Sequence, residues 1–186
     1  REMLAALNIP RDRFLLTSIF GGSIEEFVAV AKILAPVSDG LELSLSCPRA
    51  GGYGMAMGQD PDLVRDITAA VKAVVDIPVI PKLTPNTPDI AVIAAAALEG
   101  GADGLCAINT LGPGYTSAHG HPVLSNGNGG MSGKGILPIG LKCVRDIRAV
   151  TDRPIIGCGG VSSADDVRAY FDAGATVVGV GSALTG

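Results

Sequence analysis

The stretch RPIIGCGGVSSADDVRAYFDAGATVVGVGSAL, residues 153–184, contains a strand-like run, a glycine turn, a segment of helix length and a second strand-like run. The first run ends on Gly159 and Gly160, and the second ends on Gly181 and Ser182. Glycine loops with bare amides and a helix N-terminus can hold a phosphate group. Two such loops after the last two strands form the common phosphate site of a (β/α)₈ barrel. Each loop alone is also compatible with a tight turn.

The same alternation extends outward through the rest of the chain. The strand-like runs FLLTSIF, GLELSLSC, IPVIPKL and DGLCAINT are separated by segments whose apolar residues recur at helical spacing. Six βα units favour an α/β fold of the (β/α)₈ TIM barrel type, in which the loops after the strands carry the active site. A doubly wound sheet is the alternative, although no G-x-G-x-x-G follows the first strand. Helix starts are expected at Ser23 with Glu26, at Asp60-Pro61 and at Thr87-Pro88.

The chain is short for a complete barrel of this kind. It has 186 residues, whereas roughly 250 are usual. We expect residues 1–186 to form a single barrel domain from which the first two strands and the last helix are absent. Residues 111–135 are rich in Gly, Ser and Asn, and we expect them to form a long functional loop.

Composition limits the classes of partner. The net charge is −4, and no cluster of Lys or Arg provides the surface that nucleic acid or an anionic membrane requires. No apolar run is long enough for a membrane span, and the N-terminus lacks the layout of a secretory signal. The four cysteines are too widely spaced to indicate a disulfide framework or a metal site. These features predict a cytoplasmic protein that acts on small molecules.

Three other predicted strands end on residues that can carry chemistry. Cys47 ends the run ELSLSC, where a thiol of suitable pKa can act as a base, although packing is the alternative. We assign the other three cysteines to packing. Lys82 is expected at the barrel mouth, where it would need an anionic partner such as a reduced flavin or a phosphate. Asn109 and Thr110 can hydrogen-bond a planar heterocycle, but they are also common turn residues.

Five blocks carry a resemblance to a known family: ELSLSCPRAGGYGMAMGQDPDLVRDI, PKLTPNTPDI, GADGLCAINTLGPG, PVLSNGNGGMSGKGILPIGLK and the stretch quoted first. Their order and spacing resemble the catalytic chain of class 1 dihydroorotate dehydrogenases, most closely the type B and archaeal forms. The pyrimidine-reducing domain of dihydropyrimidine dehydrogenase shares much of the pattern. The resemblance implies a (β/α)₈ barrel with FMN at its mouth, whose first two strands precede this sequence.

The resemblance also implies roles for individual residues. Cys47 falls on the family's catalytic base. The residues implied to bind FMN are Lys82, Ile108, Gly130, Gly133, Gly159, Gly160, Gly181 and Ser182, and those beside the pyrimidine are Ser44, Arg49, Asn109 and Thr110. The family usually has Asn at the position of Ser44, and often Asn or His at that of Arg49. Arg49 could instead pair with a substrate carboxylate, which dihydroorotate has and dihydrouracil lacks.

The activity implied by the resemblance is FMN-dependent oxidation of dihydroorotate to orotate in de novo pyrimidine biosynthesis. A base removes a proton from one ring carbon while a hydride leaves the next carbon for the flavin. The implied partners are a subunit with FAD and an iron–sulfur cluster that passes electrons to NAD, and further copies of the chain in a homo-oligomer. The alternatives are a flavoenzyme acting on uracil-type pyrimidines, a flavin-free phosphate-binding lyase or isomerase, and an inactive fragment.

Overall fold

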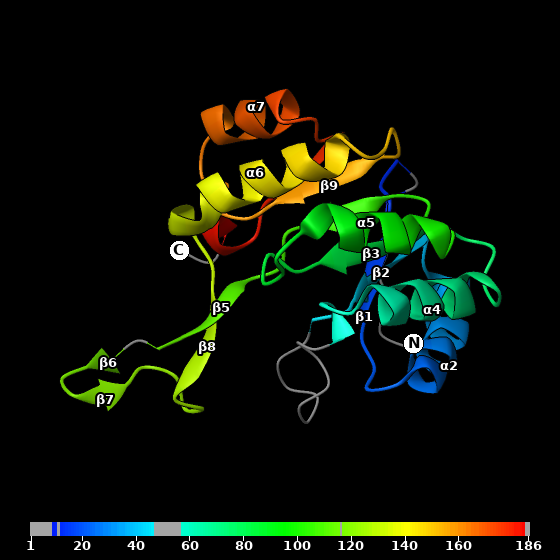
Figure 1. Ribbon diagram of the computed structural model, residues 1–186, viewed down its shortest axis with the longest axis horizontal. Coiled ribbons are helices and arrows are strands. Elements are labelled where there is room, and N and C mark those ends of the chain that lie inside the picture. The colour runs from blue at the N-terminus through cyan, green and yellow to red at the C-terminus, as the bar shows by residue number, and fades with distance from the viewer. Residues whose placement is uncertain (1–8, 11, 47–56, 116, 185–186) are drawn as a thin grey trace.

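The computed structural model describes residues 9–10, 12–46, 57–115 and 117–184, and its centre is one curled parallel sheet (Figure 1). The six strands lie in the order β1, β2, β3, β4, β9 and β10, and every neighbouring pair is parallel. Their bounds are β1 Leu16–Ile19, β2 Gly40–Ser44, β3 Val79–Leu83, β4 Leu105–Ala107, β9 Ile155–Cys158 and β10 Val177–Gly179. The six predicted strands are therefore all present, in chain order across the sheet.

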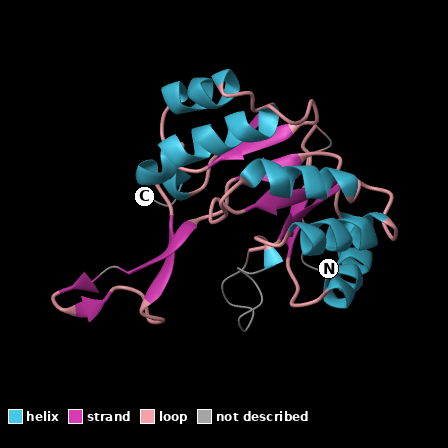
Figure 2. Ribbon diagram, viewed as in Figure 1, coloured by secondary structure: helices cyan, strands magenta, loops and turns pink. Residues whose placement is uncertain are grey.

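Helices connect these strands and cover one face of the sheet (Figure 2). They are α2 Ile24–Leu34, α4 Pro61–Lys72, α5 Ile90–Glu99, α6 Leu137–Arg148 and α7 Ala164–Asp172, with short 3₁₀ helices η1 Ala35–Val37, η2 Lys134–Ile136 and η3 Ser182–Leu184. Each long helix contacts the next one along the chain. A parallel sheet that curls inside one continuous layer of helices is part of a (β/α)₈ barrel.

Two of the three predicted helix starts are confirmed. The Ser23 side chain accepts a hydrogen bond from the amide of Glu26, and the Asp60 side chain accepts from the amides of residues 62 and 63. The third start, Thr87-Pro88, is wrong, because α5 begins at Ile90 and the Asp89 carboxylate caps it by accepting from the amide of Ala91. An aspartate two residues further on satisfies the free amides of the first turn equally well.

The two faces of the sheet differ in character. Leu41, Leu43, Val79, Leu105 and Ile155 point under the helices and are fully buried. Because side chains alternate along a strand, the residues between them point to the inner face, where Glu42, Lys82, Cys106, Ile156 and Cys158 line a cavity. The apolar side of each strand thus faces outward to the helices, and the polar side faces the barrel interior.

The glycine-rich segment forms a hairpin arm instead of the predicted loop. Strand β5 (Leu111–Tyr115) pairs antiparallel with β8 (Asn128–Met131), and beyond it β6 (Ser117–Ala118) pairs with β7 (His121–Pro122). The arm projects from the end of the sheet (Figure 1). Within the described residues, none of the helices combines the length and apolar character needed to cross a membrane.

Candidate active site

A cavity of about 390 Å³ opens at the carboxyl ends of the strands, and residues in or directly after all six strands line it. This volume is in the range of small-molecule sites. Nine residues predicted from the sequence lie on its wall: Lys82, Ile108, Asn109, Thr110, Gly133, Gly159, Gly160, Gly181 and Ser182. The strands and the loops after them therefore bring together residues from five separate parts of the chain.

The other four predicted site residues are not among the described residues of the cavity wall. Gly130 is in β8 and does not line the cavity, but a Cβ atom there would collide with the Thr110 side chain, so its absent side chain allows this close approach. Ser44 is half-buried on β2 opposite Lys82 and also does not line the cavity. Cys47 and Arg49 lie outside the described residues.

Lys82 has a buried ionic partner that the sequence analysis missed. Its Nζ lies 3.5 Å from Oε1 of Glu42, whose side chain is 11% exposed. Burial opposes the charge on Lys82, whereas Cys106, Glu42 and Cys158 favour it, and the pKa of Lys82 lies above its ordinary value. Lys82 is thus a charged ammonium at neutral pH. The signal for Glu42 was present in the sequence, because it alternates in phase with Ser44 and Ser46.

Two cysteines lie side by side on the same wall. The Sγ atoms of Cys106 and Cys158 are 3.7 Å apart, and Cys158 Sγ also donates to the carbonyl of Ile108 at 3.3 Å. The hydrogen bond to Cys158 and burial raise the pKa of Cys106, whereas the bond from Cys106 and the charge of Lys82 lower the pKa of Cys158. Both cysteines lie in strands, as predicted, and both also line the cavity; that they serve packing stays a prediction.

Asn109 is held by hydrogen bonds at the cavity edge. Its Nδ2 donates to Oγ of Ser46 at 2.7 Å, and its Oδ1 accepts from the amide of Thr110 at 2.8 Å. Asn86, which the sequence analysis did not single out, donates to the carbonyl of Thr110 and accepts from the amide of Gly112. Through its hydrogen bond with Asn109, Ser46, the residue directly before Cys47, is connected to the loop that follows β4.

The two glycine loops lie side by side because β9 and β10 are paired. Gly159 and Gly160 have φ angles of 120° and 76°, a backbone region that favours glycine. A Cβ at Gly160 would lie 2.6 Å from the amide nitrogen of Leu137, whereas one at Gly181 would meet nothing within 4 Å. The loops thus form a cradle of bare backbone beside the first turn of α7, which suits an anionic phosphate.

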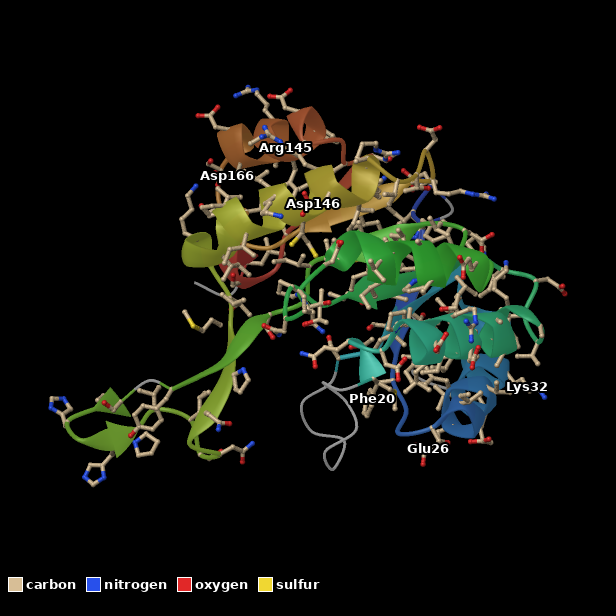
Figure 3. The ribbon with its side chains drawn as sticks, viewed as in Figure 1. Phe20, Glu26, Lys32, Arg145, Asp146 and Asp166 are labelled. Carbon is tan, nitrogen blue, oxygen red and sulfur yellow. The ribbon has the colours of Figure 1, made fainter. Side chains whose placement is uncertain are left out.

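Asp166 links the segment after Gly160 to Lys134, which begins η2 just before α6. It lies in the first turn of α7 (Figure 3), where it accepts from Lys134 Nζ at 2.5 Å and from the amide and hydroxyl of Ser162 at 2.9 and 3.0 Å. The ion pair with Lys134 and the bonds from Ser162 hold the pKa of this carboxyl far below its ordinary value. Asp166 therefore stays ionised and orders the backbone around the glycines.

These features suit a flat cofactor that ends in a phosphate, such as FMN. The glycine loops would hold the phosphate, and the Lys82 ammonium lies elsewhere on the wall of the same cavity. No group of three His, Cys, Asp or Glu residues within the described part of the chain is arranged to hold a metal ion.

Comparison with known proteins gives concordant results. A family model described as dihydroorotate dehydrogenase matches residues 7–186. The catalytic subunit of dihydroorotate dehydrogenase B (NAD(+)) from Methanocella arvoryzae is 52% identical over 171 residues, which are 91% of this chain and 56% of that protein. The corresponding subunits from Methanosarcina acetivorans and Pyrococcus horikoshii are 51% and 49% identical. The chain thus spans about 56% of the length of these relatives.

A solved structure shows the same fold. The crystal structure of dihydroorotate dehydrogenase from Eimeria tenella in complex with ferulenol superimposes with a TM-score of 0.72 at 24% identity. The match covers 87% of this chain and 49% of that chain. The sheet and its helices therefore correspond to part of a TIM barrel, as the sequence predicts.

Proposed function

Because the chain belongs to the dihydroorotate dehydrogenase family, we propose that the whole protein oxidises dihydroorotate to orotate with FMN in de novo pyrimidine biosynthesis. The observation that carries the proposal is the single cavity in which Lys82, Asn109 and the two glycine loops meet. A cation, hydrogen-bonding side chains and a phosphate cradle are what a flavin and a pyrimidine together require.

The bound FMN would accept a hydride from the substrate ring. The amides at Gly159, Gly160 and Gly181 would bind its phosphate. Lys82 would place a fixed positive charge where negative charge accumulates during hydride transfer, and such preorganised charge stabilises a transition state. Glu42 would hold the ammonium in place, since the two side chains are already 3.5 Å apart.

Removal of the substrate proton would fall to Cys47. A thiol is a competent base once its pKa approaches the working pH. The structural support is indirect: Ser46, which precedes Cys47, is buried and bonded to Asn109 on the cavity wall. Asn109 and Thr110, which line the cavity, would bind the pyrimidine, and Arg49 would pair with the carboxylate of dihydroorotate.

The names of the relatives support a proposal about partners. They are catalytic subunits of an enzyme named for NAD(+). We infer that the whole protein works in the cytoplasm, as a homo-oligomer, with an electron-transfer subunit that carries FAD and an iron–sulfur cluster.

Anaerobic titration of the whole protein tests the assignment. Dihydroorotate should bleach the flavin absorbance, whereas dihydrouracil, which has no carboxylate, should leave it unchanged. Bleaching by dihydrouracil alone would favour a uracil-type enzyme. A purified protein without flavin that cannot be reconstituted with FMN would favour a flavin-free lyase or isomerase.

A further inference from the structure

One side chain outside the cavity holds the loop on which the proposed pyrimidine contacts lie. Asn109 and Thr110 follow β4 and line the cavity, whereas Asn86 follows β3 and does not. Strands β3 and β4 are neighbours in the sheet, and the Asn86 side chain reaches across from one loop to the other. This position makes Asn86 a candidate for a residue that acts through Asn109 and Thr110.

Three hydrogen bonds join the segments that follow β3 and β4. The backbone amide of Asn109 donates to the carbonyl of Leu83 at 2.9 Å. Asn86 makes the other two bonds: its Nδ2 donates to the carbonyl of Thr110 at 3.2 Å, and its Oδ1 accepts from the amide of Gly112 at 2.9 Å. A single side chain therefore holds the backbone that directly follows Asn109.

The chemistry of these two bonds requires an amide side chain. A backbone carbonyl only accepts and a backbone N–H only donates, so a side chain that satisfies both must offer a donor and an acceptor. Asparagine offers both, whereas an ionised aspartate of the same shape offers acceptors only. Asn86→Asp would therefore keep the bond from Gly112 and place a carboxylate oxygen against the carbonyl of Thr110.

Both partners in this contact are themselves held in place. The backbone amide and Nδ2 of Asn86 donate to Oγ1 of Thr84 at 3.1 and 3.0 Å, and Thr84 is 1% exposed. Gln59 donates to the carbonyl of Asn86. Thr110 also packs against β8, because a Cβ atom at Gly130 would collide with its side chain. Thr110 is thus fixed by contacts from two separate segments of the chain.

We propose that Asn86 is a positioning residue for the pyrimidine, which fixes the loop that carries Asn109 and Thr110. The inference rests on the proposed function, because that function assigns the pyrimidine contacts to these two residues. Without the Asn86 contacts the loop would sample other conformations, and the apparent Kd rises in inverse proportion to the fraction of molecules in the binding conformation. FMN affinity should not change, because the glycine loops that would hold its phosphate follow β9 and β10.

Orotate titration of the FMN-loaded whole protein, followed by the shift of the flavin absorbance, tests this role. Asn86→Asp should raise the Kd of orotate at least about tenfold, the order of effect expected when a hydrogen bond is lost and its partner is left unpaired. Asn86→Ala removes both contacts without adding a charge, and it should raise this Kd by a similar factor. Fluorescence titration with FMN should give the wild-type Kd for both variants.

Asn126→Asp is the matched control, since it makes the same substitution in an exposed turn of the hairpin arm. It should leave both Kd values unchanged, and circular dichroism checks that all three variants fold. Wild-type orotate affinity in Asn86→Asp or in Asn86→Ala would overturn the proposal, and so would an equal loss of FMN and orotate binding. Both outcomes differ from failure of the proposed function, in which the FMN-loaded wild type itself would not bind orotate.

Discussion

The two walls of the cavity are built differently. The wall after β9 and β10 contains Gly159, Gly160 and Gly181, which have no side chains and leave the backbone uncovered. The wall formed by β2, β3 and β4 is built from side chains, with Glu42 and Lys82 as a buried ion pair. Ligand binding at the glycine wall would depend on the absence of Cβ atoms, whereas ligand binding at the side-chain wall would depend on charge. Substitutions in the two walls should therefore have different effects on cofactor binding and on the reaction rate.

The largest effect is expected at Gly160. Gly160→Ala forces a side chain into a φ of 76° and places its Cβ 2.6 Å from the Leu137 nitrogen. The backbone strain alone costs roughly 1–3 kcal/mol, and the collision would displace the loop. We expect FMN binding, measured by fluorescence titration, to be lost. Gly135→Ala is the control, because its Cβ would meet nothing within 4 Å. Undiminished FMN affinity in Gly160→Ala would show that the glycine wall does not hold the cofactor.

Loss of the proposed base, Cys47, should leave FMN binding intact and remove the chemistry. Cys47→Ala is expected to retain FMN but to slow anaerobic flavin reduction by dihydroorotate at least ~100-fold, the usual effect of removing a general base. Stopped-flow absorbance measures the rate. Cys143→Ala is the matched control, because that thiol is buried in α6. A rate close to that of wild type would assign Cys47 to packing.

Neutralising the partner of Lys82 should change the pH dependence of the reaction. Burial lowers the pKa of Lys82 and Glu42 is among the groups that raise it, so Glu42→Gln should leave Lys82 with a lower pKa. The flavin reduction rate, which needs the ammonium, should then decline at a lower pH on the alkaline side. The exposed Glu25→Gln should leave the pH profile unchanged. If both variants follow the wild-type profile, the charge of Lys82 does not assist hydride transfer.

Many of the residues that form the two walls could be predicted from the sequence. Glycines after strands and the polar ends of strands are local signals, and they singled out seven residues that line the cavity, whereas Ile108 and Gly133 came only from the family resemblance. Glu42 and the cysteine pair were missed because alternation alone does not say which face of a strand points inward. In this sheet the helices cover the apolar face, so the polar residues face the barrel. The hairpin arm was missed because its pairing, Leu111↔Met131 and Tyr115↔Asn128, joins backbone groups of glycine-rich segments.

The smallest expected effect concerns the single carboxylate that supports the glycine wall. Asp166 has a lowered pKa because it pairs with Lys134 and accepts bonds from Ser162. A carboxyl whose folded pKa is depressed stabilises the protein above its unfolded pKa, near 3.9, and this contribution is lost as the pH falls through the folded value. Asp166→Asn should therefore lower the Tm at pH 7, and the difference from wild type should shrink below about pH 4.

Calorimetric melts of both proteins across this range measure the effect, and Asp165→Asn provides the control. Asp165 is its exposed neighbour in the same first turn of α7, and it forms a surface ion pair with Arg168. Its substitution tests how much of any change comes from loss of a negative charge near the helix N-terminus. If Asp166→Asn and Asp165→Asn lowered the Tm equally, the effect would belong to the helix dipole. A larger decrease in Tm for Asp166→Asn, which becomes smaller below about pH 4, would show that the buried Asp166 carboxylate stabilises the glycine wall.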